Sequence, residues 1–204
     1  MVLRASETVS EVTRWLGRRA AMVPLSPNGW TLLALLPAGL GLVALSAGEV
    51  LVGLIAFSVA GAIDAIDGAV ARAKGLESHV GAYLDGMVDR FVEAALLIGL
   101  MLLGYPDWIL PGWLWLVLVL FFGTGMTSFA RAYADHRGIV TDPGTLASMG
   151  GVLERAERLL LVYVSMIGYM LDPIWATYTI ALGAVLAILT VIQRMYVAFT
   201  TATH

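Results

Sequence analysis

Four aspartates stand inside otherwise apolar stretches of this sequence, and their spacing suggests a shared task. Asp64 and Asp67 are three residues apart, and Asp85 and Asp89 are four residues apart. On helices, each pair therefore lies on one face. An ionised aspartate at the centre of a membrane costs about 2.5–3.5 kcal/mol on insertion scales, so several together need a compensating partner. Carboxylate oxygens are hard ligands that suit Mg²⁺, Mn²⁺ or Ca²⁺, and we therefore expect a divalent-cation site.

A structural alternative pairs these carboxylates with Arg72 and Arg90 to hold helices together. Four acids against two nearby bases leave an excess of negative charge, which makes this alternative the weaker one. Glu93, one turn beyond the second pair, adds to the excess, and it could either hydrogen-bond a metal ligand or make a structural contact. Gly68, Ala69 and Ala71 follow the first pair, where small residues indicate either space for a bulky ligand or close helix packing.

The elements that position these acids are long apolar stretches. Hydrophobic residues make up 59% of the chain and charged residues only 13%, which is far outside the range of soluble proteins. The absence of cysteine excludes disulfides and thiol catalysis. A membrane-spanning helix needs about 20 apolar residues. The sequence predicts an all-α integral membrane protein with six such spans, at about 28–47, 50–72, 82–104, 110–134, 151–171 and 175–198.

Residues 3–20 differ from the spans, because apolar residues recur there at helical spacing with arginines on the other faces. This pattern predicts an amphipathic helix in the membrane interface. A soluble amphipathic helix packed on the loops is the alternative. We therefore expect two parts, a juxtamembrane helix over residues 1–25 and a membrane domain over residues 26–204.

The basic residues indicate the orientation. All twelve Lys and Arg lie near the N-terminus, in or beside the second and fourth connections, or near the C-terminal end, and the other three connections hold none. The positive-inside rule then places both termini and the acidic site in the cytoplasm, which fits a multi-pass protein of the plasma membrane. Trp108, Trp113 and Trp175 would form an aromatic belt at the opposite rim.

The acids also belong to a longer pattern. The segment Asp64-Ala-Ile-Asp67-Gly68-Ala-Val-Ala71-Arg72, followed after eight residues by Gly81 and then by Asp85 and Asp89, resembles the CDP-alcohol phosphotransferase signature at all eight of its fixed positions. The resemblance extends from about Pro27 to the last span. It implies a six-helix membrane enzyme, usually dimeric, with a polar cavity open to the cytoplasm.

The resemblance also implies roles for single residues. It makes Asp64, Asp67, Asp85 and Asp89 ligands of two Mg²⁺ or Mn²⁺ ions, with Asp89 also the general base. It assigns the CDP part of a CDP-activated lipid to Gly68, Arg72 and Ser78. Pro27-Asn28-Gly-Trp-Thr31 is similar to the family's Pro-Asn-x-x-Thr element, so Asn28 and Thr31 become further candidates for nucleotide contact. Asn28 could also cap a helix N-terminus.

A set of arginines suggests the acceptor, since arginine suits bidentate recognition of phosphate. The set consists of Arg131, Arg155, Arg158 and Arg194. The segments around these residues resemble the family branch that uses inositol phosphate, although Tyr133 and Ala156 stand where that branch carries Arg and Pro. The alternative is ordinary positive-inside charge with a Glu154–Arg158 helix pair.

Together these observations predict a transferase of phospholipid biosynthesis that moves a phosphatidyl-type group, diacyl or archaeal ether, from a CDP-activated lipid to inositol phosphate and releases CMP. The same chemistry with glycerol phosphate or serine as acceptor is the nearest alternative. A cation or proton transporter using intramembrane carboxylates is the alternative of another class. We expect membrane lipids and a second copy of the chain as partners, and no nucleic acid.

Overall fold

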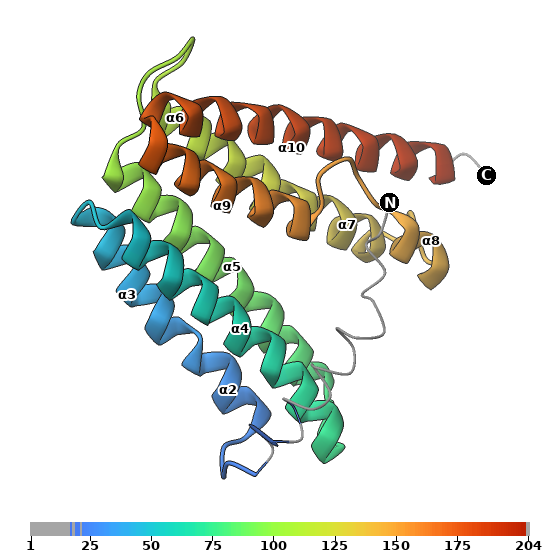
Figure 1. Cartoon of the computed structure of the whole chain (residues 1–204). Helices are drawn as coiled ribbons and strands as arrows, with labels where there is room; N and C mark the ends of the chain where they lie inside the picture. Colours follow the sequence, from blue (N-terminus) through green and yellow to red (C-terminus); the bar gives the residue numbers. More distant parts are fainter. Residues whose placement is uncertain (1–16, 18, 21, 203–204) are drawn as a thin grey trace. The chain divides into compact units, whose positions relative to one another are not determined.

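The computed structural model describes residues 17, 19, 20 and 22–202, and across these residues it is helical with no β-strand (Figure 1). An isolated β-bridge joins Trp108 and Leu110. The predicted all-α class is confirmed. The amphipathic helix expected over residues 3–20 lies outside the described residues except for Gly17, Arg19 and Ala20, which are helical.

Each apolar stretch that the sequence marks as a span is helical. In chain order the elements are α2 (Pro27–Leu33), α3 (Leu35–Ser46), α4 (Val50–Lys74), α5 (His79–Leu103), α6 (Gly112–Leu118), η1 (Val119–Met126), α7 (Thr127–His136), α8 (Pro143–Ser148), α9 (Arg155–Leu171) and α10 (Pro173–Ala202). The helices α2 and α3 together cover the first stretch, and α6, η1 and α7 cover the fourth. The short α8 lies in the fourth connection and was not predicted.

Four helical segments of the described chain are long and apolar enough to cross a membrane. They are Pro27–Ser46, Val50–Lys74, Gly112–His136 and Pro173–Thr201. The other two stretches differ for identifiable reasons. The helix α5 carries four charged side chains between Asp85 and Glu93, and α9 has 17 residues with a charged first turn. The length and composition of the four segments are those of membrane-spanning helices. Both charged helices carry some of the candidate site residues: Asp85 and Asp89 lie on α5, and Arg155 and Arg158 lie on α9.

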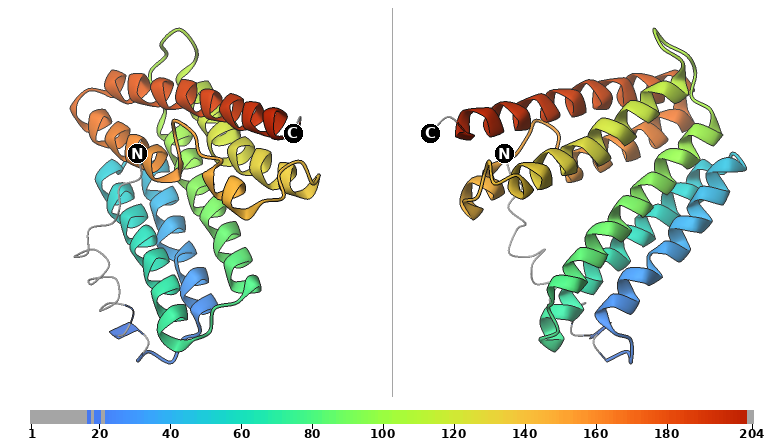
Figure 2. Two further views of the ribbon diagram at one scale, coloured as in Figure 1. Left: turned by 90° about the vertical axis from the view of Figure 1, so that its right-hand side faces the viewer. Right: turned by 180° about the vertical axis from the view of Figure 1, so that it is seen from behind.

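The described chain forms two compact units, one up to Leu96 and one from Leu97 onward. In the first unit, α2 and α3 pack along α4 (Figures 1 and 2). Glycines make this contact close: a Cβ at Gly41 would lie 2.6 Å from the Phe57 ring, and one at Gly53 would lie 2.6 Å from Leu45 Cδ2. Small residues at such contacts let helices approach closely in a membrane, where apolar burial alone drives little association.

The helix α4 ends in a glycine turn that lies between Arg72 and Ser78, two of the predicted donor residues. Gly75 caps α4 with φ +63°, a left-handed conformation that a glycine adopts at little cost. The Lys74 Nζ donates to the carbonyl oxygens of Leu25 (2.9 Å) and Val23 (3.3 Å), so this end of α4 is tied to the segment before α2.

The start of α2 corrects one expectation. The residue that caps α2 is Ser26, whose Oγ accepts a hydrogen bond from the Gly29 N–H at 3.1 Å. Pro27 occupies the first helical position, where its fixed φ is suited and its missing N–H is not needed. Asn28 is therefore inside the helix, and the prediction that it is the cap was wrong.

In the second unit, α10 packs against α9, η1, α6 and α7 (Figure 2). Ala184 and Ala187 of α10 are fully buried in this packing. The fourth stretch is not a uniform α-helix, because η1 is a π-helix of eight residues. Each residue of a π-helix bonds to the fifth residue before it, which widens the turn, and hydrophobic periodicity gave no sign of this.

The connection between α5 and α6 is held to the second unit by a hydrogen bond and by aromatic contacts. The buried Tyr105 hydroxyl hydrogen-bonds with Ser165 Oγ at 2.9 Å, and burial raises the pKa of Tyr105. Trp108 and Trp175 both contact the ring of Tyr178, with centroid separations of 5.0 and 5.9 Å. Two of the three tryptophans expected as a belt therefore lie together.

The fourth connection is held against α10 by hydrogen bonds. The backbone N–H groups of Val152 and Leu153 donate to Gln193 Oε1 and Thr190 Oγ1, each at 2.9 Å. Asp142 caps α8, and the N–H and hydroxyl of Thr145 lower the pKa of Asp142. The contacts with α10 fix where α9 begins, and α9 carries two of the candidate arginines.

Candidate active site

The first unit brings together three of the four predicted metal ligands. Carboxylate oxygens of Asp64, Asp67 and Asp85 lie within 4.8 Å of one another. The i, i+3 spacing places the first two on one face of α4, and the short turn after Gly75 brings Asp85 of α5 opposite them. Asp67 is only 5% exposed. Three carboxylates this close repel one another unless a cation lies between them, and their oxygens are a donor set that suits Mg²⁺ or Mn²⁺.

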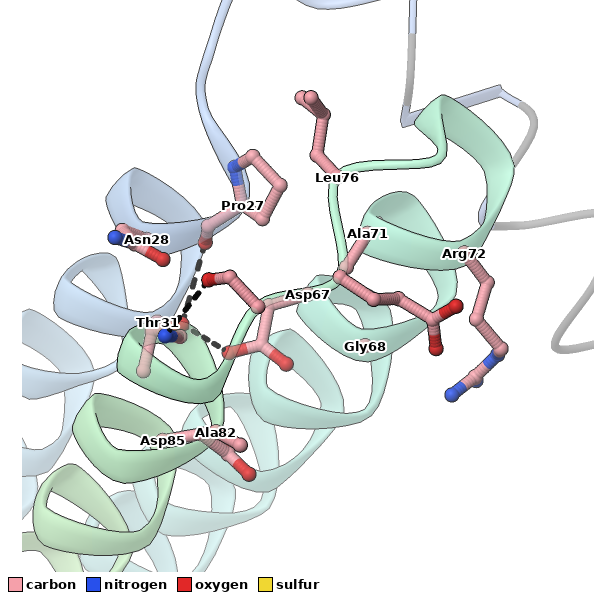
Figure 3. Close-up of a pocket in the computed structure, with 13 residues that line it drawn as sticks. Pro27, Asn28, Thr31, Asp67, Gly68, Ala71, Arg72, Leu76, Ala82 and Asp85 are labelled. Carbon is pink, nitrogen blue, oxygen red and sulfur yellow. Dashed lines mark hydrogen bonds between the residues drawn. The ribbon is translucent and has the colours of Figure 1, made fainter.

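Thr31 also contacts one of the predicted metal ligands. Its hydroxyl donates to Asp67 Oδ2 at 2.5 Å, and both side chains are buried (Figure 3). The same oxygen lies 3.2 Å from the carbonyl oxygen of Pro27. A hydroxyl has one proton, and the shorter contact shows that the proton goes mainly to the carboxylate. Thr31 thus fixes the orientation of Asp67, a predicted metal ligand.

A cavity of about 180 Å³ opens beside these carboxylates. It is formed by the start of α2, the end of α4, the following turn and the start of α5. Its lining includes every residue that the resemblance assigned to the donor, namely Asn28, Thr31, Gly68, Arg72 and Ser78, and it also includes Asp67 and Asp85. Figure 3 shows Arg72 and Gly68 on α4 with Asn28 and Pro27 on the neighbouring α2. The predicted donor residues and two predicted metal ligands therefore share one cavity.

Two glycines of the signature keep this cavity open. A Cβ at Gly81 would lie 3.1 Å from Ser78 Oγ and 3.4 Å from Asn28 Oδ1, so a side chain there would crowd two donor candidates. Ser78 Oγ also accepts the Gly81 N–H at 3.0 Å. At Gly68 a Cβ would meet only the Arg72 guanidinium, at 3.5 Å or more. The space at Gly68 therefore belongs to the cavity and not to a helix contact.

Asp89 and Glu93, the other acids of α5, are buried. Asp89 is 7% exposed, and its Oδ2 lies 3.8 Å from a guanidinium nitrogen of Arg90. The ion-pair alternative therefore describes part of the surroundings of Asp89. Glu93 is 3% exposed. In the part of the chain that the structure describes, the close carboxylate group has three members and does not include Asp89.

The second unit brings the predicted acceptor arginines together from three helices. Arg194 on α10 lies within electrostatic range of Arg131 on α7, of Glu154 just before α9 and of Arg158 on α9. Arg158 is 5% exposed, and Arg194 Nη1 donates to the carbonyl oxygen of Thr127 at 2.5 Å. Arg155 is half-buried on the first turn of α9. Of the four predicted acceptor arginines, Arg158 is buried, Arg155 and Arg194 are half-buried and Arg131 is exposed.

The positions that depart from the inositol-phosphate branch lie on the exposed surface. Tyr133 is 47% exposed and stacks on Phe129 with a centroid separation of 5.0 Å. Ala156 is also exposed. Both residues are therefore on the surface, and neither stands at a buried position. The sequence reasoning did not single out Leu76, Glu77 and Ala82, which also line the first cavity. Only their proximity to the signature could have indicated them.

The class of this protein follows from these features and from its relatives. A family model described as CDP-alcohol phosphatidyltransferase matches residues 24–193. The chain belongs to this family, and it is a membrane-bound transferase. The alternative of a cation or proton transporter is thereby set aside.

Two named relatives show which members of the family this chain resembles. The chain is 30% identical over 199 residues to archaetidylinositol phosphate synthase of Pyrococcus horikoshii, covering 97% of this chain and 96% of that protein. It is 31% identical over 192 residues to phosphatidylinositol phosphate synthase of Corynebacterium glutamicum, covering 85% and 78%.

Solved structures agree with this assignment. The crystal structure of Mycobacterium tuberculosis phosphatidylinositol phosphate synthase with CDP-DAG bound has a TM-score of 0.78 and 26% identity, covering 93% of this chain and 94% of that one. A second structure of that enzyme, in complex with manganese and citrate, has the same TM-score and 25% identity, and covers 92% of this chain and 89% of that one.

Proposed function

We propose that this protein transfers a phosphatidyl-type group from a CDP-activated lipid to inositol phosphate and releases CMP. The observation that carries the proposal is the cavity in which the signature residues meet, because it combines a group of three carboxylates with Arg72 and a space free of side chains. Relatives named as inositol phosphate lipid synthases support the choice of acceptor.

The donor nucleotide would occupy the cavity beside α4. Arg72 is exposed there and can pair with the diphosphate, while Gly68 leaves room for it to approach the helix backbone. Ser78 and Asn28 face the same space near Gly81 and can hydrogen-bond the sugar or the base. Thr31 donates its proton to Asp67, so we assign it to the support of that metal ligand and not to the nucleotide.

Asp64, Asp67 and Asp85, with Asp89, would hold two Mg²⁺ or Mn²⁺ ions. When bound, such ions neutralise charge on phosphate oxygens and help to orient an in-line displacement. The manganese-containing structure of the Mycobacterium tuberculosis enzyme supports this use of the acidic group. The hydrogen bond from Thr31 holds one ligand oxygen of Asp67 in place before any ion arrives.

Asp89 would act as the general base. In the transfer, the acceptor oxygen forms a bond to the lipid-bearing phosphorus, and the bond from that phosphorus to the oxygen of CMP breaks. The proton of the acceptor hydroxyl passes to the Asp89 carboxylate, and CMP leaves with the bonding electrons. A guanidinium nitrogen of Arg90 lies 3.8 Å from Asp89 Oδ2 and places a positive charge beside this carboxylate.

The acceptor phosphate would lie among Arg131, Arg155, Arg158 and Arg194. A dianionic phosphate ester accepts several charge-assisted hydrogen bonds, and planar guanidinium groups supply them in pairs. Burial of Arg158 makes these bonds stronger than they would be in water. Glycerol phosphate would satisfy the same arginines, whereas serine would leave them without a phosphate.

We further propose that α5 and α9 also cross the membrane, which gives six spans, and that both termini and the site face the cytoplasm at the plasma membrane. The charges that distinguish α5 and α9 belong to the two sites and would face the protein interior. Residues 1–25 would form the juxtamembrane helix and residues 26–204 the membrane domain. A homodimer is expected from the family resemblance.

The test of this function is a panel of acceptors with purified protein and CDP-activated lipid, in which CMP and the lipid product are both measured. Inositol phosphate should be used best, glycerol phosphate less well, and serine not at all. Equal use of free serine would refute the acceptor assignment, and CMP release without a new lipid would refute transfer.

Two arginine variants, one inside the proposed acceptor site and one outside it, make the test specific. Arg158→Ala should raise the KM for inositol phosphate about tenfold or more, because a charge-assisted hydrogen bond contributes about 1.5–3 kcal/mol. The KM for the CDP-lipid should stay within about twofold, since its contacts are assigned to the other unit. Arg137→Ala is the matched control, because Arg137 is exposed and its guanidinium lies over the Tyr133 ring at 6.0 Å.

A further inference from the structure

The π-helical segment η1 lies at the point where two of the acceptor arginines are held. Gly123, near the middle of η1, is buried, and a Cβ built on it would lie 2.6 Å from Arg158 Cδ and 3.3 Å from Arg158 Nε. It would also lie 3.6 Å from the Cβ of Ala187 on α10. Because Arg158 is only 5% exposed, its stem has little room to yield. The side chain of Arg158 therefore crosses η1 where there is no side chain.

The second arginine is fixed one turn later. The carbonyl oxygen of Thr127, the first residue of α7, accepts the hydrogen bond from Arg194 Nη1 at 2.5 Å. The hydroxyl of Thr127 in turn donates to the carbonyl oxygen of Gly123. Thr127 is buried, so water cannot readily replace the hydrogen bond between its hydroxyl and Gly123. One short stretch of chain thus contacts Arg158 of α9 and Arg194 of α10, and its own hydrogen bond links the two contact points.

The local backbone explains why this stretch can do so. A π-helix has a wider turn than an α-helix, and such segments recur at functional sites. Gly125, two residues after Gly123, faces open space: a Cβ there would meet only the Leu120 carbonyl oxygen at 3.8 Å. The close approach to the arginine is therefore specific to position 123.

We propose that Gly123 and Thr127 are positioning residues for the acceptor phosphate, and that they set the guanidinium groups of Arg158 and Arg194 in register with a single phosphate ester. The inference rests on the proposed function, which assigns the two arginines to that phosphate. Neither residue touches the acceptor. They act by fixing where Arg158 crosses η1 and where Arg194 binds the backbone. Bidentate recognition depends on the orientation of both groups, so a small displacement reduces acceptor affinity.

The experiment compares Gly123→Ala with Gly125→Ala in the purified full-length chain. Each variant is titrated with inositol phosphate at saturating CDP-lipid, and with CDP-lipid at saturating inositol phosphate. Gly123→Ala should raise the KM for inositol phosphate about tenfold, the scale of one lost charge-assisted bond, and leave the KM for CDP-lipid within about twofold. Gly125→Ala adds the same methyl group to the same π-helix and should leave both KM values unchanged. An unchanged acceptor KM in Gly123→Ala, or equal changes for donor and acceptor, would overturn the inference.

A second pair of variants decides the question if Gly123→Ala does not fold. Thr127→Val keeps the side-chain volume and removes the hydroxyl that donates to Gly123, and it should raise the acceptor KM severalfold. Thr127→Ser keeps that hydroxyl and should restore the affinity. A Thr127→Val variant with normal acceptor KM would overturn the inference.

Arg158→Ala separates this inference from the proposed function. If Arg158→Ala leaves the acceptor KM unchanged, the proposed acceptor site is wrong and the inference falls with it. If Arg158→Ala raises that KM and neither Gly123→Ala nor Thr127→Val does, the proposed function stands and the positioning role is wrong.

Discussion

Replacing Thr31 with valine tests how the metal ligands are held. Valine has nearly the shape of threonine but lacks the hydroxyl that donates to Asp67 Oδ2 at 2.5 Å. Thr31 is 4% exposed and Asp67 is 5% exposed, so water cannot replace the lost donor readily. The acidic group itself remains complete, because Asp64, Asp67 and Asp85 are unchanged. The perturbation therefore removes one contact of one ligand and little else.

The size of the effect follows from that contact. A hydrogen bond to a charged group contributes about 1.5–3 kcal/mol, and about 1.4 kcal/mol corresponds to a tenfold change in an equilibrium constant. Mutation of second-shell partners of metal ligands typically costs about 10–100-fold in metal affinity. We therefore expect the apparent activation constant for Mn²⁺ to rise about 10–100-fold in Thr31→Val. At saturating Mn²⁺, most of the activity should return.

The assay is a Mn²⁺ titration of activity together with direct Mn²⁺ binding measured by electron paramagnetic resonance. Thr31→Ser keeps the hydroxyl and should bind Mn²⁺ nearly as the unaltered protein does. A Thr31→Val variant with unchanged Mn²⁺ affinity would refute the reasoning. If that variant instead showed a higher KM for CDP-lipid at saturating Mn²⁺, Thr31 would be a nucleotide contact, as its motif first suggested.

Three further changes test other parts of the site. Chelation should abolish activity and Mg²⁺ or Mn²⁺ should restore it, since three carboxylates within 4.8 Å need a cation between them; full turnover in chelator would exclude a metal-dependent reaction. Asp89→Asn keeps the side-chain shape and removes the proton acceptor, so kcat at saturating metal should fall about 10²–10⁴-fold. A rate near that of the unaltered protein would mean that another group is the base. Gly81→Ala brings a methyl group to 3.1 Å from Ser78 Oγ. It should raise the KM for CDP-lipid severalfold and leave the KM for inositol phosphate unchanged. The opposite pattern would show that this cavity is not the donor site.

The helical class and the approximate limits of the helices could be predicted from the sequence, because long apolar stretches leave few other ways to satisfy the backbone in a membrane. The prediction that Asp64, Asp67 and Asp85 converge was also possible from sequence. Helical spacing fixes the face of each aspartate, and the short turn after Gly75 makes α4 and α5 neighbours. The same reasoning predicts that Asp89, one turn beyond Asp85, joins them, and this remains a prediction.

Other features were decided only by tertiary structure. The role of Thr31 as partner of Asp67 depends on how α2 meets α4, which motif spacing does not describe. The π-helix η1 left no mark in the hydrophobic pattern, since its residues are as apolar as those of a regular span. Gly123 looks like any small residue of a membrane helix until Arg158, 35 positions later in the chain, is seen to cross it. Sequence spacing determines which residues share a helix face, whereas contacts between residues on different helices arise only when the helices pack.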